Sequence, residues 1–297
     1  MRLTRTVIVG ARGLGPDVVL AGLALGVLAL VAKGLGGQLQ IPWDGVLPFL
    51  GVAAALLAIS ALTNIVLHRP LGLLRSVRLW SPFAVVYLCY RALRGALPVV
   101  VEHGVESTLV RADQFLLGSS PAWSLSIIHT PWLTELLSYA YATMFFLPLA
   151  VLLVLHARGR DSDLREVAVS LQLAFYIGFA LFMLVPARSP DVLYVFPPLE
   201  GGPFFEASMR AWHSLQAVTY DAFPSMHTTI STIALAQAVR MRLGLWRWMV
   251  PVVLLLQLAT LYLRQHYFVD VVAGWGVAAL AITTARWAVH FTWSAPR

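Results

Sequence analysis

The chain of 297 residues contains little charge and almost no cysteine. Only 12% of its residues are Asp, Glu, Lys or Arg, against about 25% in a typical soluble domain, while 59% are apolar. So few charges cannot cover the surface of a soluble domain, which excludes a soluble enzyme or a disordered chain and leaves an integral membrane protein. The single cysteine, Cys89, excludes a disulfide scaffold and any metal site built from several thiolates.

Long apolar runs predict an all-α fold, a polytopic membrane helix bundle with about eight transmembrane helices. A spanning helix needs roughly 20 apolar residues. The sixth run is short and carries Thr228 and Ser231, so we expect it to face other helices. The first run lacks a small-residue cleavage site, so we expect a retained helix and not a signal peptide. The eight runs are 17–33, 47–67, 80–100, 132–156, 166–186, 226–241, 247–263 and 269–290.

The distribution of the charges behind the net charge of +7 indicates how the chain is oriented in the membrane. Most of the 21 Lys and Arg residues fall in alternate connections, which predicts that both termini are cytoplasmic. The basic clusters are short and lack interleaved aromatic residues, so we expect no nucleic-acid partner. These cytoplasmic residues are Arg2, Arg5, Arg12, Arg69, Arg75, Arg78, Arg158, Arg160, Arg165, Arg240, Arg242, Arg247, Arg286 and Arg297.

Two stretches on the opposite side of the membrane do not read as spans. Residues 101–131 predict a short amphipathic segment at the interface, and residues 187–225 predict a long external loop rich in Pro, Gly and aromatic residues. A loop of this length in a compact protein is usually functional. We expect one compact membrane domain, in which residues 1–79 add two helices to a core at 80–297.

Two motifs on this outer side carry candidate catalytic residues. In the first, Pro224 marks the start of a helix whose unpaired N–H groups and dipole suit a phosphate. Ser225 adds a hydroxyl group, and His227 follows within about one turn. In the second, His266 and Asp270 are i, i+4 neighbours if the segment is helical, so the carboxylate can orient the ring and leave one nitrogen free as a base or nucleophile.

Each feature alone has an ordinary explanation, such as an interfacial histidine, a surface ion pair or a helix start. Their convergence on one side of the membrane, at the ends of consecutive helices, favours a catalytic site. Arg264 stands next to the second motif, and its planar guanidinium group suits phosphate oxygens.

The sequences Phe-Pro-Ser-Met-His at 223–227 and Arg-Gln-His-Tyr-Phe-Val-Asp-Val-Val-Ala-Gly at 264–274 resemble the type-2 phosphatidic acid phosphatase superfamily. Within it, the Gln-His-Tyr-x-x-Asp pattern is most similar to the branch of inositol phosphorylceramide synthase. The resemblance covers roughly residues 80–290. The stretch at 113–121, which begins at Asp113, resembles a segment upstream of the core in this branch.

The resemblance implies a six-helix core and a role for each motif residue. His266 is the nucleophile that forms a phosphohistidine, Asp270 orients it, and His227 is the general acid. Ser225 binds a phosphoryl oxygen. Membrane lipids are the substrates, and neither a metal nor another cofactor takes part.

The chain departs from the common phosphatase pattern in two places. Thr260 stands where the pattern has an arginine, and the Lys-x6-Arg-Pro motif has no counterpart. The phosphate must therefore be held by other cations. Candidates are Arg188, Arg264, Arg91 and Arg94.

These observations predict a phosphotransferase or phosphatase that acts on lipid head groups at the extracytoplasmic face. A simple lipid-phosphate phosphatase is one alternative, and a non-enzymatic lipid transporter or flippase is another. Transporters usually carry their charged groups at the membrane midplane within inverted repeats, whereas these motifs lie at one interface. A structural scaffold is a further alternative. It would not need two histidines and an aspartate on one face, so a separation of His266 and His227 far above about 6–7 Å would favour it.

Overall fold

The computed structural model describes residues 19–24, 26, 48, 51–56, 58, 80, 83–93, 103–215 and 220–293. These residues form helices and connecting segments, and an isolated bridge between Ala187 and Asp221 is the only β pairing among them. The predicted all-α class is therefore confirmed. Most of the runs at 17–33 and 47–67 lies outside the described residues, so the division at residue 79 stays a prediction.

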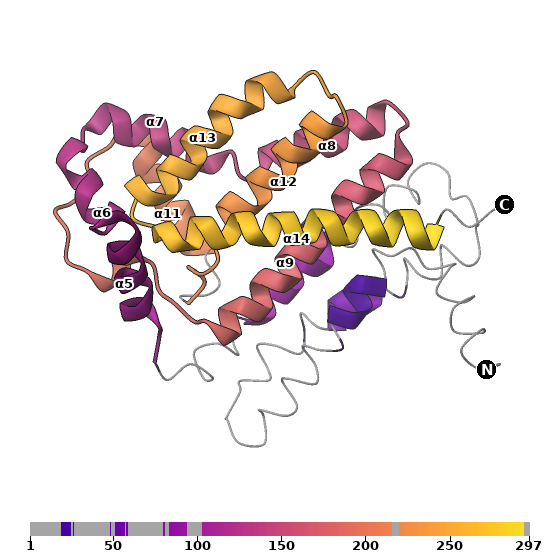
Figure 1. Ribbon diagram of the computed structural model, residues 1–297, viewed down its shortest axis with the longest axis horizontal. Coiled ribbons are helices and arrows are strands. Elements are labelled where there is room, and N and C mark those ends of the chain that lie inside the picture. The colour runs from indigo at the N-terminus through magenta and orange to yellow at the C-terminus, as the bar shows by residue number, and fades with distance from the viewer. Residues whose placement is uncertain are drawn as a thin grey trace.

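The helices follow one another along the chain with short connections (Figure 1). A helix at Phe83–Leu93 comes before the labelled series. The series is α5 (Glu106–Leu117), α6 (Pro121–Ser124), η1 (Leu125–Ile128), α7 (Pro131–Ala142), α8 (Phe146–Ala157), α9 (Asp161–Leu184), α10 (Pro190–Leu193), α11 (Pro203–Leu215), α12 (Met226–Arg240), α13 (Trp246–Tyr262) and α14 (Phe268–Trp293).

Helix α12 lies at the centre of the bundle. It packs against α8, α9, α13 and α14, and α14 also packs along α9. The polar residues Thr228, Thr229 and Ser231 are fully buried together with the apolar Ile230 and Ile233. The prediction that the sixth run faces other helices is thus confirmed.

The apolar run at 132–156, predicted as one span, is two helices. Helices α7 and α8 are bent by 40° across the break at 143–145. Pro148 explains the break, because a proline inside a continuous helix lacks its N–H and clashes with the carbonyl four residues earlier. Thr143 supports the bend by donating its hydroxyl to the carbonyl of Ala140, at 2.6 Å.

The predicted external loop at 187–225 contains helices α10 and α11. Helix α11 begins at Pro203, a favoured first residue because its missing N–H would have no partner there. The two carboxylate oxygens of Glu135, on α7, accept the backbone N–H groups of Phe204 and Phe205 at 3.0 and 2.8 Å. The loop prediction is therefore wrong for 203–215, where a distant side chain caps a helix start.

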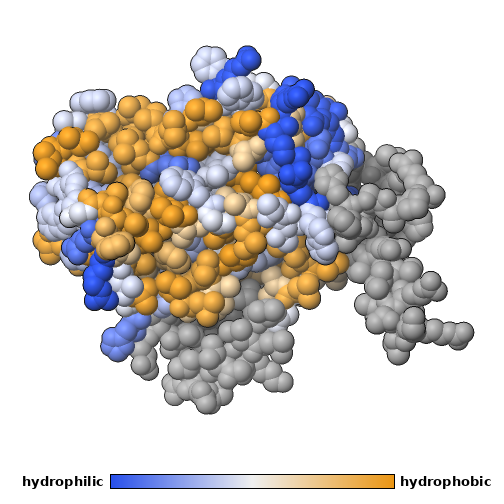
Figure 2. Space-filling model, viewed as in Figure 1, coloured by the Kyte–Doolittle hydropathy of each residue, from blue (hydrophilic) through white to orange (hydrophobic). Residues whose placement is uncertain are grey.

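The protein is an integral membrane protein. Among the described helices, α9 and the Phe268–Val289 part of α14 are long and apolar enough to span a bilayer, and α7 with α8 forms a third span if the bent pair is counted as one. Helices Phe83–Leu93 and α13 are apolar but shorter. Apolar side chains cover much of the visible bundle, and the largest group of hydrophilic residues lies at one end, at the upper right (Figure 2).

The arginine-bearing turns lie together at that end. Arg160, before α9, donates to the backbone carbonyl of Met241, after α12, at 3.0 Å. Glu166 is buried nearby and pairs with Arg240. His227 occupies the opposite end of α12, and His266 comes just before the opposite end of α14.

Gly274 lets α12 and α14 approach each other closely. A Cβ atom on this residue would lie 2.8 Å from the backbone oxygen of Ser225 and 3.1 Å from Cβ of Thr228. The hydroxyl of Thr229 instead donates to the carbonyl of Gly274, at 3.1 Å. Small residues serve membrane helices in this way because they bring two backbones into contact.

We therefore expect Gly274→Ala to destabilise the protein by about 1–3 kcal/mol through overpacking. Gly276→Ala is the matched control on the same helix, because a Cβ there meets nothing within 4 Å. Alanine is the better helix former by roughly 0.5–1 kcal/mol, so this control should be neutral or stabilising. Thermal unfolding in detergent measures both, and equal melting temperatures for the two variants would contradict the close contact.

Candidate active site

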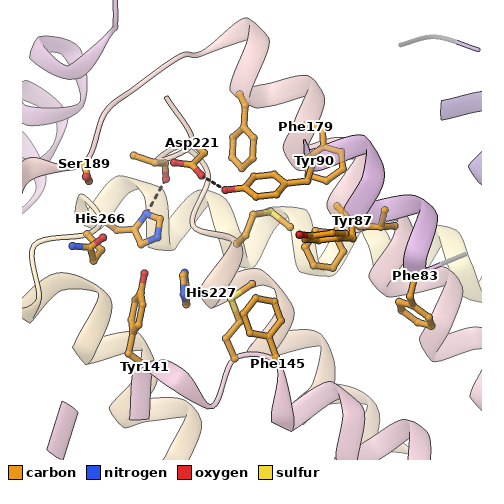
Figure 3. A pocket seen from close by; sticks show the side chains of 17 residues that line it. Phe83, Tyr87, Tyr90, Tyr141, Phe145, Phe179, Ser189, Asp221, His227 and His266 are labelled. Carbon is orange, nitrogen blue, oxygen red and sulfur yellow. Dashed lines mark hydrogen bonds between the residues drawn. The ribbon is translucent and has the colours of Figure 1, made fainter. Parts of the chain in front are cut away.

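A cavity of about 460 Å³ reaches from the two histidine motifs into the bundle (Figure 3). Its polar end holds His227, His266, Asp221, Ser189 and Gln265. The rest of its wall is aromatic and aliphatic, and comes from the Phe83–Leu93 helix, α7, α9 and the segment between α7 and α8. These residues are Phe83, Val86, Tyr87, Tyr90, Tyr141, Met144, Phe145, Phe175, Phe179 and Phe182, joined by Ala222 and Met226.

His266 is held with one ring nitrogen turned toward the protein. Its Nδ1 lies 2.8 Å from the backbone carbonyl of Ala222. Because a carbonyl only accepts hydrogen bonds, Nδ1 carries the proton and Nε2 is left with its lone pair. The ring is buried yet lines the cavity, so this geometry suits a nucleophile or base.

Asp270 supports His266 from the first turn of α14. Its Oδ2 lies 3.4 Å from Nδ1 of His266 and accepts the backbone N–H of Tyr267 at 2.9 Å. The predicted i, i+4 pairing is present, although the shorter contact of the imidazole is to Ala222. The carbonyl fixes the ring, and the carboxylate places negative charge beside it.

His227 lies in the first turn of α12 and faces the same cavity. Its ring stacks on Tyr141, with centroids 4.0 Å apart and planes inclined by 23°. The rings of His227 and His266 have centroids 5.7 Å apart. Two imidazoles at this distance are close enough to act on opposite sides of one small group.

Ser225 serves as the N-cap of α12. Its Oγ accepts the N–H of Thr228 at 3.3 Å, and its own N–H donates to the carbonyl of Asp270 at 3.0 Å. The residue is fully buried and is not among the cavity-lining residues, which include its neighbours Met226 and His227. In this arrangement Ser225 joins the two motifs, and its contact with phosphate stays a prediction.

Arg188 is engaged by Glu106 and lies away from the cavity wall. Its Nε donates to Oε1 of Glu106 at 2.9 Å, and its side chain remains 37% exposed. Burial raises the pKa of Glu106, but hydrogen bonds from Arg188 and from the backbone of Glu106, together with the charge of Arg188, hold the pKa below its ordinary value. Ser189, the next residue, does line the cavity.

Arg264 also points toward other protein groups. Its Nη1 donates to the carbonyl of Pro197 at 2.7 Å, Nη2 lies 3.0 Å from Nδ1 of His129, and the guanidinium carbon sits 4.4 Å above the ring of Phe196. The residue is buried and has a positive φ of 63°. Arg264 thereby fastens the 196–197 segment beside the second motif.

Arg91 lies on the Phe83–Leu93 helix, next to the cavity residue Tyr90. It is partly buried and is not among the residues that line the cavity. Arg94 lies outside the described residues. The prediction that these arginines clamp phosphate is therefore not tested by the geometry.

Several polar cavity residues were not singled out from the sequence. Asp221 accepts a hydrogen bond from the hydroxyl of Tyr90 at 2.9 Å, and Gln265 donates to Asp191 at 2.9 Å. Asp221 and Gln265 could have been found from the sequence, because they lie within or next to the two histidine motifs. Tyr141 carried no such signal, because it lies within an apolar run.

Comparison with known protein families identifies the fold to which these motifs belong. A family model described as the PAP2 superfamily matches residues 107–284, which is more than half of the chain and includes both histidine motifs. The chain belongs to the PAP2 superfamily. Membership supports an enzyme of the phosphatase or phosphotransferase type. No curated protein and no solved structure matched the chain.

The stacked pair of Tyr141 and His227 gives a test of how this PAP2 enzyme orients His227. An aromatic pair contributes about 0.5–1.5 kcal/mol beyond its buried area. We expect Tyr141→Phe to keep the stack and most of the phosphoester turnover. Tyr141→Leu should lower turnover about tenfold, because the imidazole ring of His227 is then less well fixed.

Tyr139→Leu is the matched control for this test. Tyr139 stacks on Phe204 with centroids 3.9 Å apart, on the same helix but outside the cavity lining. It should lower the melting temperature without lowering turnover per folded molecule. Full turnover by Tyr141→Leu would show that the stack does not position His227.

Proposed function

We propose that this protein transfers or hydrolyses the phosphorylated head group of a membrane lipid through a phosphohistidine on His266. The observation that carries the proposal is the pairing of His227 and His266, 5.7 Å apart, at the polar end of a cavity whose other walls are aromatic and aliphatic. Such a cavity suits a ligand with a polar head and an apolar body.

The proposed reaction has two steps. Nε2 of His266 attacks phosphorus, while protonated His227 gives its proton to the departing alkoxide oxygen. The positive charge that develops on His266 is offset by Asp270 and by the bond from Nδ1 to Ala222. Water or an acceptor alcohol then attacks phosphorus, loses its proton to His227 and releases His266. No step requires a metal.

A lipid substrate is supported by the far part of the cavity. Phe83, Tyr87 and Phe145 line it, and Tyr87 and Phe145 are more than half exposed. Apolar tails therefore have a path from the reacting phosphorus to the surface that faces the bilayer. The head group would lie at the polar end, against Ser189, Asp221 and Gln265.

Topology supports a site on the extracytoplasmic side, with both termini in the cytoplasm. The arginine-bearing turns at 158–165 and 240–247 are joined through Arg160 and Met241. The histidine motifs lie at the opposite ends of the same helices. Because short cytoplasmic loops are enriched in Lys and Arg, this polarity favours an outward-facing site.

Within this function, the Gln-His-Tyr-x-x-Asp pattern favours transfer between lipids, as in inositol phosphorylceramide synthase. A simple lipid-phosphate phosphatase remains the alternative. The two are separated by incubating purified protein with phospholipids and lipid phosphates, with and without a lipid alcohol, and identifying the products by mass spectrometry.

Turnover in EDTA tests the metal-free scheme, which a strict metal requirement would contradict. Movement of lipid without any product would instead support a flippase.

His266→Ala should abolish turnover and phosphoenzyme formation while leaving the helical content and melting temperature near those of the wild type. The reason is that the side chain supplies the attacking nitrogen, whereas the fold loses only a ring that borders the cavity and its bond to Ala222, at a cost of about 1–3 kcal/mol. Acid-labile labelling from a phosphorus-labelled substrate, followed by peptide mapping, measures the intermediate. Persistent turnover by the purified variant would remove His266 from the nucleophile role.

His227→Ala should slow turnover by roughly 10²–10⁴-fold for substrates whose leaving alkoxide needs a proton. A substrate with an acidic leaving group, such as a nitrophenyl ester, should lose much less because its leaving oxygen needs little protonation. Parallel kinetics with the two kinds of substrate give the comparison. Equal losses would argue against a general-acid role.

A further inference from the structure

Helix α5 holds the start of α14 through a buried carboxylate. Asp113 is fully buried, and its two oxygens accept the backbone N–H groups of Phe268 and Val269, each at 2.9 Å. The first N–H groups of a helix have no partner within the helix and carry its positive dipole end. Figure 1 shows α5 beside this end of α14. His266 lies two residues before Phe268, with Tyr267 between them.

This cap differs from the cap of α12. Helix α12 is capped by its own Ser225, which is adjacent in sequence. Helix α14 is capped by a residue 155 positions away along the chain. Burying a carboxylate is costly unless it is well bonded, so a local cap would stabilise α14 with less desolvation. A cap from another helix does more, because it also fixes the position of the start of α14 relative to α5.

A second acid on the same face of α5 holds the other side of the site. Glu106 stands two turns before Asp113, and its Oε1 accepts both the backbone N–H and Nε of Arg188, at 3.1 and 2.9 Å. The hydroxyl of Tyr267 donates to the carbonyl of Arg188, at 3.2 Å. The two carboxylates thus act on segments that are themselves bonded to each other.

An apolar residue between these two acids on α5 lies in the same buried cluster as Ala222, whose carbonyl accepts the hydrogen bond from His266. Leu109, on the same face of α5, packs in one buried cluster with Ala187, Ala222 and Tyr267. Ala222 is the residue whose carbonyl binds Nδ1 of His266. The buried face of α5 is therefore in contact with the segments on either side of the imidazole.

From this geometry we infer that Asp113 is a positioning residue for His266, and that Glu106 holds the 187–189 segment in position in the same way. The inference rests on the proposed function, since it assigns to α5 the task of holding the nucleophile in line. Displacement of a reacting group by about 1 Å is enough to slow an enzyme about 100-fold.

The experiment uses the full-length protein in nanodiscs and combines hydrogen exchange with kinetics. Asp113→Asn keeps the size of the side chain but replaces one acceptor oxygen with a donor that opposes an N–H. We expect faster exchange at 267–270 and a fall in kcat of about 10–100-fold with KM unchanged. Glu106→Gln should instead speed exchange at 187–189. Gln114→Ala, an exposed change on the same helix, should alter neither.

Asp113→Glu gives a second variant if Asp113→Asn does not fold. It keeps the charge that compensates the α14 dipole, while the extra methylene group displaces the acceptor oxygens. It should lower kcat without lowering the melting temperature to the same degree. A purely structural role would lower the melting temperature and leave kcat per folded molecule unchanged, which would overturn the inference.

The two arms separate failure of this inference from failure of the proposed function. Unchanged exchange at 267–270 in Asp113→Asn would overturn the contact whatever the activity. Faster exchange with wild-type kcat would overturn the positioning role. A wild-type protein that turns over no lipid phosphoester would refute the proposed function and with it the catalytic role of Asp113, while the exchange data would still decide the contact itself.

Discussion

The hydrogen bond from the backbone N–H of Ser225 to the carbonyl of Asp270 joins the two histidine motifs, and the site depends on it. The bond forms only because α12 and α14 meet at Gly274, where a side chain would strike the Ser225 backbone. Through it, the turn that carries Ala222 comes within reach of His266. The distance between the two imidazole rings is therefore set by the backbone contact between α12 and α14, in addition to the rotamer of each side chain.

Much of this site could be predicted from sequence, because its key features are local. Pro224 and Ser225 mark a helix start, and the spacing of His266 and Asp270 places them within reach of each other. The polar residues of α12 indicated burial among helices, which the structure confirms. Longer-range features were not readable: the bend between α7 and α8 depends on how Pro148 is accommodated, and α11 depends on Glu135 from another helix.

The arginines show why position in the sequence does not give direction in space. Arg264 is two residues from His266, yet its positive φ and the partners Pro197 and His129 carry the guanidinium group to the 196–197 segment. Arg188 is held by Glu106, from a helix that the sequence predicts only as an amphipathic segment. A long flexible side chain goes where its partners are, and those partners are set by the packing of helices far apart in the chain.

Polar bonds are concentrated at the two ends of the bundle, and this distribution explains how a cavity can persist between them. At one end Arg240 and Glu166 join α12 to α9, and at the other Asp113 and Ser225 fix the starts of α14 and α12. With both ends fixed, the middle can be lined by large aromatic side chains that do not fill it completely. An apolar cavity of this kind costs stability, because its lining loses packing contacts. The bonds at the ends of the helices offset that cost, so the fold can keep an apolar cavity open beside two histidines.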